Sequence, residues 1–417
     1  MDNQNNFKPY IPAEKITPEL TVTSIIVGVL LAVIFGAANA YLGLKVGMTV
    51  SASIPSAVIA MGIIKMILRK NSVLEVNMVQ TIGSSGESLA AGAIFTLPAL
   101  FIWASDGIMN KPSIVEITLI AIIGGLLGIF FMVPLRNALI VKEHGILPYP
   151  EGTACAEVIL AGEKGGASAK TVFAGMGFAA LFKFIIDGLK VVAGEVAITF
   201  KGFAGTIGTQ IYPAVMSVGY ICGPRIASFM FGGGMLAWLV LIPLIVFFGG
   251  ETVQSTFEAD GAYGIWSNYI KYIGAGALVA GGFISLVKSM PLIVKTFADA
   301  IKGLSFKANG NAKRTEKDMN FLFVILGVAV LALVIWIVDI IPVNLIGAIS
   351  IVIFGFFFAT VSSRMVGLVG SSNNPVSGMT IATVLVATVL LKATGMIGTK
   401  GMISAISIAS IVCIVTA

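Results

Sequence analysis

The sequence predicts an all-α, polytopic membrane protein with about twelve transmembrane spans of roughly 20 residues each. Of the 417 residues, 57% are hydrophobic and 11% are charged, whereas soluble domains carry about 25% charged residues. Apolar runs long enough to cross the hydrocarbon core recur along the whole chain. A transmembrane β-barrel would instead show alternating segments of about ten residues, and the sequence contains none.

The spans follow from these runs in chain order. They are predicted near residues 20–44, 47–68, 73–103, 113–134, 168–193, 211–230, 232–250, 265–287, 320–341, 343–362, 375–394 and 400–417. Glycines interrupt the third run, which predicts a discontinuous helix. A further apolar piece, 150–162, is too short to cross and is predicted to be re-entrant or interfacial.

Four parts are expected. Residues 1–19 are polar and form an N-terminal tail, and 20–287 form a first membrane bundle. Residues 288–319 combine a lysine-rich amphipathic helix on the membrane surface with a charged linker. Residues 320–417 begin a second bundle, which we expect to be incomplete because the chain stops inside an apolar run.

Lysines and arginines between the apolar runs orient the chain. With the amino terminus inside, the basic clusters at 8–15, 65–70, 136–170 and 288–317 all face the cytoplasm, and the acidic loop 251–260 faces the other side. This pattern predicts a multi-pass protein of the inner (plasma) membrane with a cytoplasmic amino terminus. The formal charge of +6 therefore reflects orientation and does not indicate a nucleic-acid partner.

The stretch 83–88, Gly-Ser-Ser-Gly-Glu-Ser, is predicted to break a helix at membrane depth. Main-chain groups freed there are tolerated only inside protein or beside a watery cavity, and secondary transporters build midplane sites from such helices. A carboxylate at this depth costs about 3 kcal/mol, which favours Glu87 as a proton-coupling group, with Ser84 and Ser85 as substrate contacts. Alternatively, Glu87 lies at the interface and Ser84 or Ser85 caps a helix start.

A second motif, Leu-Pro-Tyr-Pro-Glu-Gly-Thr-Ala at 147–154, opens the short helix. The amino end of a helix favours anions, so Tyr149, Glu151 and Thr153 are candidates for binding a substrate. Glu157 lies one turn beyond Thr153 on the same face and is a second proton-coupling candidate. An ordinary interfacial loop followed by an amphipathic helix explains the motif equally well.

Two further stretches supply candidate substrate contacts. Gly223 and Pro224 predict a kink, and Arg225 beside them could pair with a substrate carboxylate, although the topology favours an arginine that reaches the cytoplasmic interface. The amides of Asn373 and Asn374 could bind a peptide-like ligand, and a simple turn with a helix cap explains them equally well.

The sequence lacks the residues that several kinds of site require. Three scattered cysteines and a single histidine exclude a disulfide framework and make a bare transition-metal site improbable, so any metal is expected to arrive inside a chelator. The chain has neither a phosphate-binding Gly-x-x-x-x-Gly-Lys loop nor a metal-binding His-Glu-x-x-His helix. We therefore predict no cofactor, no resident metal and no enzyme, with a channel or a membrane-embedded enzyme as the alternatives from another class.

The motifs at 77–88, 147–154, 219–223 and 370–378 together resemble the oligopeptide transporter family. The form Tyr-Pro-x-Gly-Thr-Ala is similar to its yellow-stripe-like branch and bacterial relatives. The resemblance implies a secondary active transporter that takes up small oligopeptides with protons by alternating access, or carries metal complexes of siderophore-like or nicotianamine-like chelators. Members of the family are longer, which fits a chain without its C-terminal part.

The resemblance has a limit at position 151. Glu151 stands where plant relatives more often have a small polar residue, so the specificity for a chelate does not carry over. The expected partners are a peptide or chelate substrate, protons and the lipid bilayer. The sequence leaves the exact substrate and the formation of a homo-oligomer open.

Overall fold

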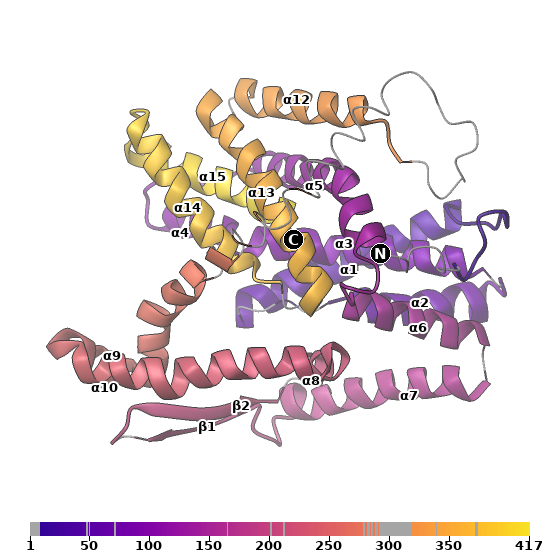
Figure 1. Ribbon diagram of the computed structural model, residues 1–417, viewed down its shortest axis with the longest axis horizontal. Helices are drawn as coiled ribbons and strands as arrows, with labels where there is room; N and C mark the ends of the chain where they lie inside the picture. The colour runs from indigo at the N-terminus through magenta and orange to yellow at the C-terminus, as the bar shows by residue number, and fades with distance from the viewer. Residues whose placement is uncertain are drawn as a thin grey trace.

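The computed structural model is mostly helical (Figure 1). It describes residues 9–417 apart from 47–48, 50, 71, 165, 201, 212, 278–279, 282–283, 285–286, 288–290, 292–317, 339 and 372–373. The predicted surface helix and linker at 288–319 lie almost entirely outside the described residues.

The helices follow the apolar runs of the sequence. They are α1 (Val22–Val46), α2 (Ser53–Met61), α3 (Val73–Ile94), α4 (Leu97–Ser105), α5 (Ile114–Arg136), α6 (Pro150–Lys164), α7 (Gly166–Lys183), α8 (Pro213–Leu236), α9 (Ile242–Phe248), α10 (Gly250–Ile265), α12 (Phe321–Ile337), α13 (Leu345–Val369), α14 (Val376–Ala393) and α15 (Gly398–Thr416). Short wider turns extend several of them, at Gly62–Ile67, Asn137–Lys142, Phe184–Gly188, Ala237–Leu241 and Trp266–Ile270.

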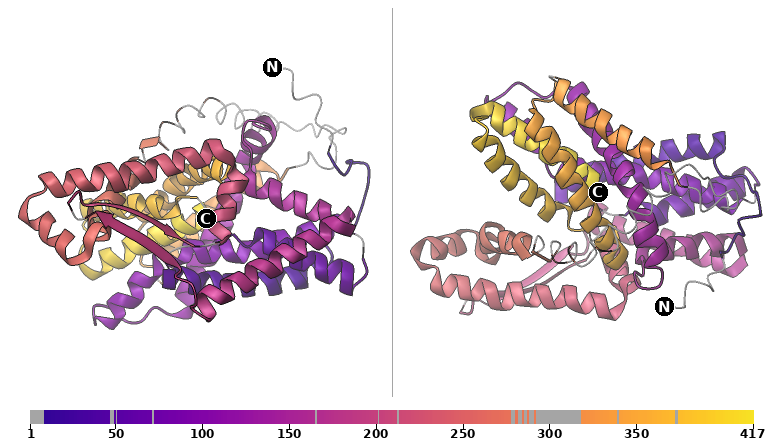
Figure 2. Two further views of the ribbon diagram at one scale, coloured as in Figure 1. Left: turned by 90° about the horizontal axis from the view of Figure 1, so that it is seen from below. Right: turned by 45° about the horizontal axis from the view of Figure 1, so that its top comes forward.

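The core lies where the later helices pack onto the earlier ones. α15 packs against α3, α5, α13 and α14, so the end of the described chain is enclosed by the rest. Fully buried side chains in this region are Leu100, Ile120, Leu127, Ile335, Ile351, Ile408 and Ile411. By contrast, α8, α9 and α10 lie along one side of the body formed by α1–α6 and α12–α15 (Figures 1 and 2).

Seven helices in the described part of the chain are long and apolar enough to cross a membrane. They become eight if α3 and α4, which bend by 46° at their junction, form one span. The predicted spans 211–230 and 232–250 are not separate, because helical structure continues through Gly232 to Gly234. Glycine weakens a helix. A turn among apolar residues would, however, leave main-chain groups without hydrogen bonds, so the three glycines remain helical.

The predicted break at 83–88 is wrong, because α3 is continuous from Val73 to Ile94. Its glycines let α1 approach: a side chain on Gly86 would overlap the main chain of Ala32, and one on Gly83 would meet Leu31 and Ser56. Small residues serve such close packing of membrane helices. The bend lies instead at the junction of α3 and α4.

The all-α prediction also needs a correction. Strands β1 (Glu195–Phe200) and β2 (Gly205–Gln210) form an antiparallel hairpin in which Glu195 pairs with Gln210 and Phe200 with Gly205. The alternating β-branched residues of β1 favour a strand, and the stretch is too short to form a span. The predicted acidic loop 251–260 is helical and belongs to α10, which is kinked at Gly261.

Candidate functional site

Glu87 is a buried acid near the middle of α3. Its side chain is 5% exposed, and Oε2 accepts a hydrogen bond of 2.9 Å from the N–H of Ala52, just before α2. A buried carboxylate is costly unless it is paired or well hydrogen-bonded. Within the described part of the chain, this amide is the only hydrogen-bond donor to Glu87.

Glu151 is a second buried acid, in the first turn of α6. Its Oε2 accepts hydrogen bonds from the N–H of Ser371 at 2.9 Å and from the Ser371 hydroxyl at 2.5 Å. Ser371 follows Gly370, which ends α13 with a φ of 86°. A Cβ on Gly370 would stand 2.7 Å from Cδ of Glu151. Only glycine therefore fits both this backbone conformation and this contact.

The two acids lie on elements that pack together, since α6, which carries Glu151, contacts both α2 and α3. The site therefore joins four elements that are far apart in the sequence. They are the middle of α3, the residue before α2, the start of α6 and the connection between α13 and α14. The sequence predicted both acids as site residues, but on separate motifs.

Tyr149 lies two residues before Glu151 and, like it, is bound to the end of α13. It has a left-handed φ of 44°; its N–H donates to the Gly367 carbonyl at 2.9 Å, and its hydroxyl donates to the Leu139 carbonyl at 3.3 Å. Burial raises the pKa of Tyr149, and the neighbouring Glu143 carboxylate raises it further, while Arg364 lowers it. The phenol therefore stays neutral at physiological pH.

The other candidate residues of the first two motifs either donate hydrogen bonds within their own segments or are exposed. The hydroxyls of Ser84 and Ser85 donate to carbonyls of their own helix, at Thr81 and Ile82, so neither serine caps a helix start. The N-cap of α3 is Ser72. The exposed Thr153 donates to the Pro148 carbonyl, and Glu157 is exposed on α6.

Asn374 has clear structural partners, whereas Arg225 has no hydrogen bond or ion pair to the residues that the structure describes. The amide of Asn374 donates to the Ser362 hydroxyl at 2.7 Å and to the Thr416 carbonyl at 2.9 Å, which ties α13 to α15. The predicted kink at Gly223 is confirmed, but Arg225 is exposed on α8. Asn373 lies outside the described residues.

Sequence reasoning missed Ser371, Ala52 and the ion pair of Arg364 with Glu143. Arg364 carried a readable signal, because a charge inside an apolar run marks a buried partner, but the predicted span ended two residues before it. Ser371 lies in the motif 370–378, in which only the asparagines were selected. Ala52 gave no signal, since it contributes only its main-chain amide.

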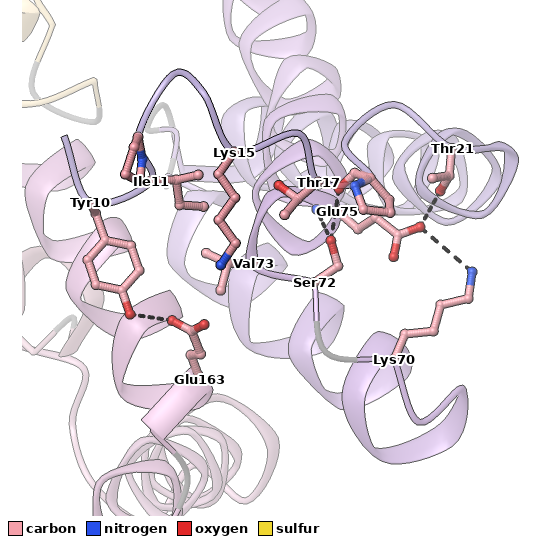
Figure 3. Close-up of a pocket in the computed structure, with 12 residues that line it drawn as sticks. Tyr10, Ile11, Lys15, Thr17, Thr21, Lys70, Ser72, Val73, Glu75 and Glu163 are labelled. Carbon is pink, nitrogen blue, oxygen red and sulfur yellow. Dashed lines mark hydrogen bonds and ion pairs between the residues drawn. The ribbon is translucent and has the colours of Figure 1, made fainter.

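A separate cavity of about 700 Å³ lies beneath the N-terminal segment (Figure 3). At one end the Tyr10 hydroxyl donates to Glu163 at 2.6 Å, and at the other the Thr21 hydroxyl donates to Glu75 at 2.5 Å. The carboxylate of Glu163 raises the pKa of Tyr10 through this hydrogen bond. The lining residues are Tyr10, Ile11, Pro12, Lys15, Thr17, Pro18, Thr21, Lys70, Ser72, Val73, Glu75 and Glu163. Its two lysines balance its two glutamates, and it contains none of the predicted site residues.

Potential metal ligands do not gather in the described part of the chain. No group of three or more His, Cys, Asp or Glu side chains comes together there in a way that could hold a metal ion.

Comparison with known proteins gives one family. The sequence profile described as OPT oligopeptide transporter protein matches residues 19–417. A putative oligopeptide transporter of Haemophilus influenzae is 31% identical over 376 residues, covering 85% of this chain and 58% of that protein. The probable metal-nicotianamine transporters YSL8 of Arabidopsis thaliana and YSL14 of Oryza sativa are each 24% identical, over 72% and 74% of this chain and 45% and 48% of their own lengths. The chain thus spans about half the length of the curated relatives that it matches.

Proposed function

The chain belongs to the OPT oligopeptide transporter family, and from this premise we propose that it works as a proton-coupled secondary transporter. It takes up small oligopeptides or peptide-like compounds by alternating access. The family and the names of the relatives point to a transporter rather than an enzyme. The observation that carries the proposal is the buried acid pair of Glu87 and Glu151.

The proposed coupling group is Glu87, and Glu151 replaces the exposed Glu157 as its partner. A buried carboxylate with a single donor is costly to keep charged, which suits Glu87 to bind and release the coupled proton. The Ala52 amide stabilises a charge on Glu87, and the amide and hydroxyl of Ser371 stabilise one on Glu151. When the site opens to the cytoplasm, water can solvate both carboxylates, which allows the proton to leave.

Tyr149, Glu151 and Asn374 form the proposed wall of the substrate site. Tyr149 and Glu151 are held against the end of α13, and Asn374 follows it on the α13–α14 connection. A peptide offers amides and two charged ends, which such hydroxyl, carboxylate and amide groups can bind. The contacts proposed for Ser84, Ser85, Thr153, Arg225 and Asn373 stay predictions.

A second candidate substrate is a metal chelate, because two of the matched relatives are named as probable metal-nicotianamine transporters. A chelate of this kind is also a compound derived from amino acids, so the same wall could receive it. We also propose about twelve spans of roughly 20 residues, an inner-membrane location and a cytoplasmic amino terminus.

The test is uptake into proteoliposomes under an imposed pH gradient. The probes are radiolabelled dialanine, trialanine and tetra-alanine, together with iron-nicotianamine. We expect the wild type to accumulate at least one probe uphill and to lose this accumulation when a protonophore is added. Glu87→Gln should abolish the accumulation, while Glu75→Gln, a buried acid on the same helix, should retain it.

Two results would contradict the proposal. Wild-type accumulation in Glu87→Gln removes Glu87 from the coupling role. A flux of probe that never exceeds equilibrium in the wild type identifies a channel.

A further inference from the structure

The segment 143–151, which leads into α6, lies along the last turns of α13. We call the contacts between residues 143–151 and residues 364–371 the seam. It contains an ion pair, a main-chain hydrogen bond, an apolar contact and the hydrogen bonds of Glu151. It therefore joins the first predicted bundle to the second at the acid pair.

The seam begins with an ion pair. Nη1 of Arg364 donates to both carboxylate oxygens of Glu143, at 2.9 and 3.1 Å. The Arg364 side chain is 28% exposed and the Glu143 side chain 12%. Arg364 stands within a helix that is apolar enough to span the membrane. A charge there is costly without a partner, and removing one member of a buried pair is strongly destabilising.

The middle of the seam packs closely against Gly367 of α13. The Tyr149 N–H donates to the Gly367 carbonyl at 2.9 Å. A Cβ on Gly367 would lie 3.0 Å from Cδ1 of Leu147 and 3.2 Å from Cζ of Tyr149. Leu147 is also buried in an apolar cluster with Leu135 and Leu139. The segment therefore packs directly on the helix backbone.

The spacing of the seam sets its register. Its positions 364 and 367 lie on neighbouring turns of one face of α13, and 371 follows the helix end at Gly370. The first contact holds Glu143 and the last holds Glu151. An ion pair with defined geometry is a good register device, because a shifted segment would leave a charge unpaired.

We propose that Arg364 and Glu143 are positioning residues for the acid pair: their ion pair locks the seam in register and so keeps Glu151 on Ser371, beside Glu87. The hydrogen bond to the proposed coupling group Glu87 comes from Ala52 and from neither of these two residues. When the pair is broken, segment 143–151 is free to shift along α13, and Glu151 loses its two donors. The expected effect on transport rests on the proposed function, whereas the effect on the seam does not.

The transport test is a charge swap in proteoliposomes, with the probe that the wild type accumulates. We expect Arg364→Gln and Glu143→Gln each to lower the maximal uptake rate about tenfold, between the effects expected for an exposed and for a fully buried ion pair. The double variant Glu143→Arg with Arg364→Glu should recover to within about threefold of the wild type, and Arg364→Lys should recover in part.

The matched control is a second ion pair, Arg136 with Asp318, whose side chains are both 36% exposed. Arg136→Gln should leave the uptake rate unchanged, because exposed pairs contribute little. Equal losses in Arg136→Gln and Arg364→Gln would overturn the proposal, and so would a swap variant that folds with wild-type thermal stability yet stays as slow as Arg364→Gln.

A cross-linking test needs no substrate. In a background with Cys155, Cys222 and Cys413 replaced by alanine, Leu147→Cys with Gly367→Cys places two Cβ atoms about 3.3 Å apart, close to disulfide geometry. We expect fast oxidation to a disulfide, and a severalfold slower reaction when Arg364→Gln is added. Leu147→Cys with Leu368→Cys, in the same apolar cluster, serves if the first pair does not fold.

The outcomes separate the two proposals. An unchanged oxidation rate in Arg364→Gln overturns the positioning role, whatever transport shows. A slower oxidation rate, in a protein whose wild type accumulates no probe, supports the positioning role and overturns only the proposed transport function.

Discussion

Glu75 and Glu87 are both buried on α3, about three turns apart, yet their surroundings differ. Residues 75, 79, 83 and 87 are all buried, and Glu75 and Glu87 are 2% and 5% exposed. Glu75 stands in the first turn and accepts a hydrogen bond from Thr21, with Nζ of Lys70 at 3.7 Å. Glu87 stands in mid-helix, with one amide donor among the described residues and with Glu151 on a helix that packs against α3.

The difference teaches that burial alone does not mark a functional acid. A hydroxyl and an ammonium group lie beside Glu75 in the first turn of α3, which suits an anchor between α1 and α3. Glu87 has only the Ala52 amide as a donor among the described residues, which fits the proton-coupling role proposed for it. The partners of an acid therefore say more about its role than its exposure does.

The substitution Glu87→Gln should have the largest effect on transport and so tests this comparison most directly. We expect a loss of pH-driven accumulation of about a hundredfold, the scale of losing a positioned proton-transfer group. Thermal unfolding in detergent should be unchanged or shifted upward, because a neutral amide is less costly to bury than a carboxylate. A variant that unfolds early and transports normally would give Glu87 the anchoring role instead.

Glu151→Gln should have the next largest effect. The amide oxygen still accepts hydrogen bonds from Ser371, so the seam should stay closed, while the second titratable group is lost. We expect accumulation to fall about tenfold with little loss of stability. Ser371→Ala, as the companion variant, keeps the acid and removes one donor, and a larger defect there than in Glu151→Gln would contradict the role of the acid.

Glu75→Gln tests the anchoring side of the comparison. The charge-assisted hydrogen bond from Thr21 weakens, and we expect unfolding to become easier by about 1–2 kcal/mol. The partner Lys70 is 46% exposed and adds little. The ratio of uptake with and without a pH gradient should equal that of the wild type. A collapsed ratio in a folded protein would place Glu75 in the coupling path.

Tyr10→Phe should have the smallest effect, because Tyr10 is an exposed tether. The hydrogen bond to Glu163 raises the pKa of Tyr10 above 10.0. The tether therefore contributes below pH 10 and is lost as the pH rises through the raised value. A difference absorbance titration of wild type against Tyr10→Phe should show one late tyrosinate transition, with uptake unchanged. An ordinary transition would mean that the tether is not formed.

The sequence predicted the parts of the fold that depend on composition. Long apolar runs became helices, the kink at Gly223 is present, and Glu87 and Glu151 stood out because acids are rare in such runs. The helix break at 83–88 was wrong because a glycine that admits a neighbouring helix looks the same in one sequence as a glycine that frees the backbone. Only the partner helix, here α1, distinguishes them.

The acid pair itself could not be predicted from one sequence. Glu87 and Glu151 belong to different helices, and their donors are the amides of Ala52 and Ser371. A main-chain amide has no residue-type signature, so no pattern marks it. Arg364 was within reach, because a lone charge in an apolar run implies a partner, but the choice of Glu143 depends on how the chain folds back.

The unbroken α3 has a consequence for selectivity. Since each of its central main-chain groups is already used inside the helix, α3 can offer a guest molecule only its side chains. The amide groups beside the two acids belong to the short connectors around positions 52 and 371. Variants designed to change the substrate specificity should therefore alter these connectors first and leave α3 unchanged.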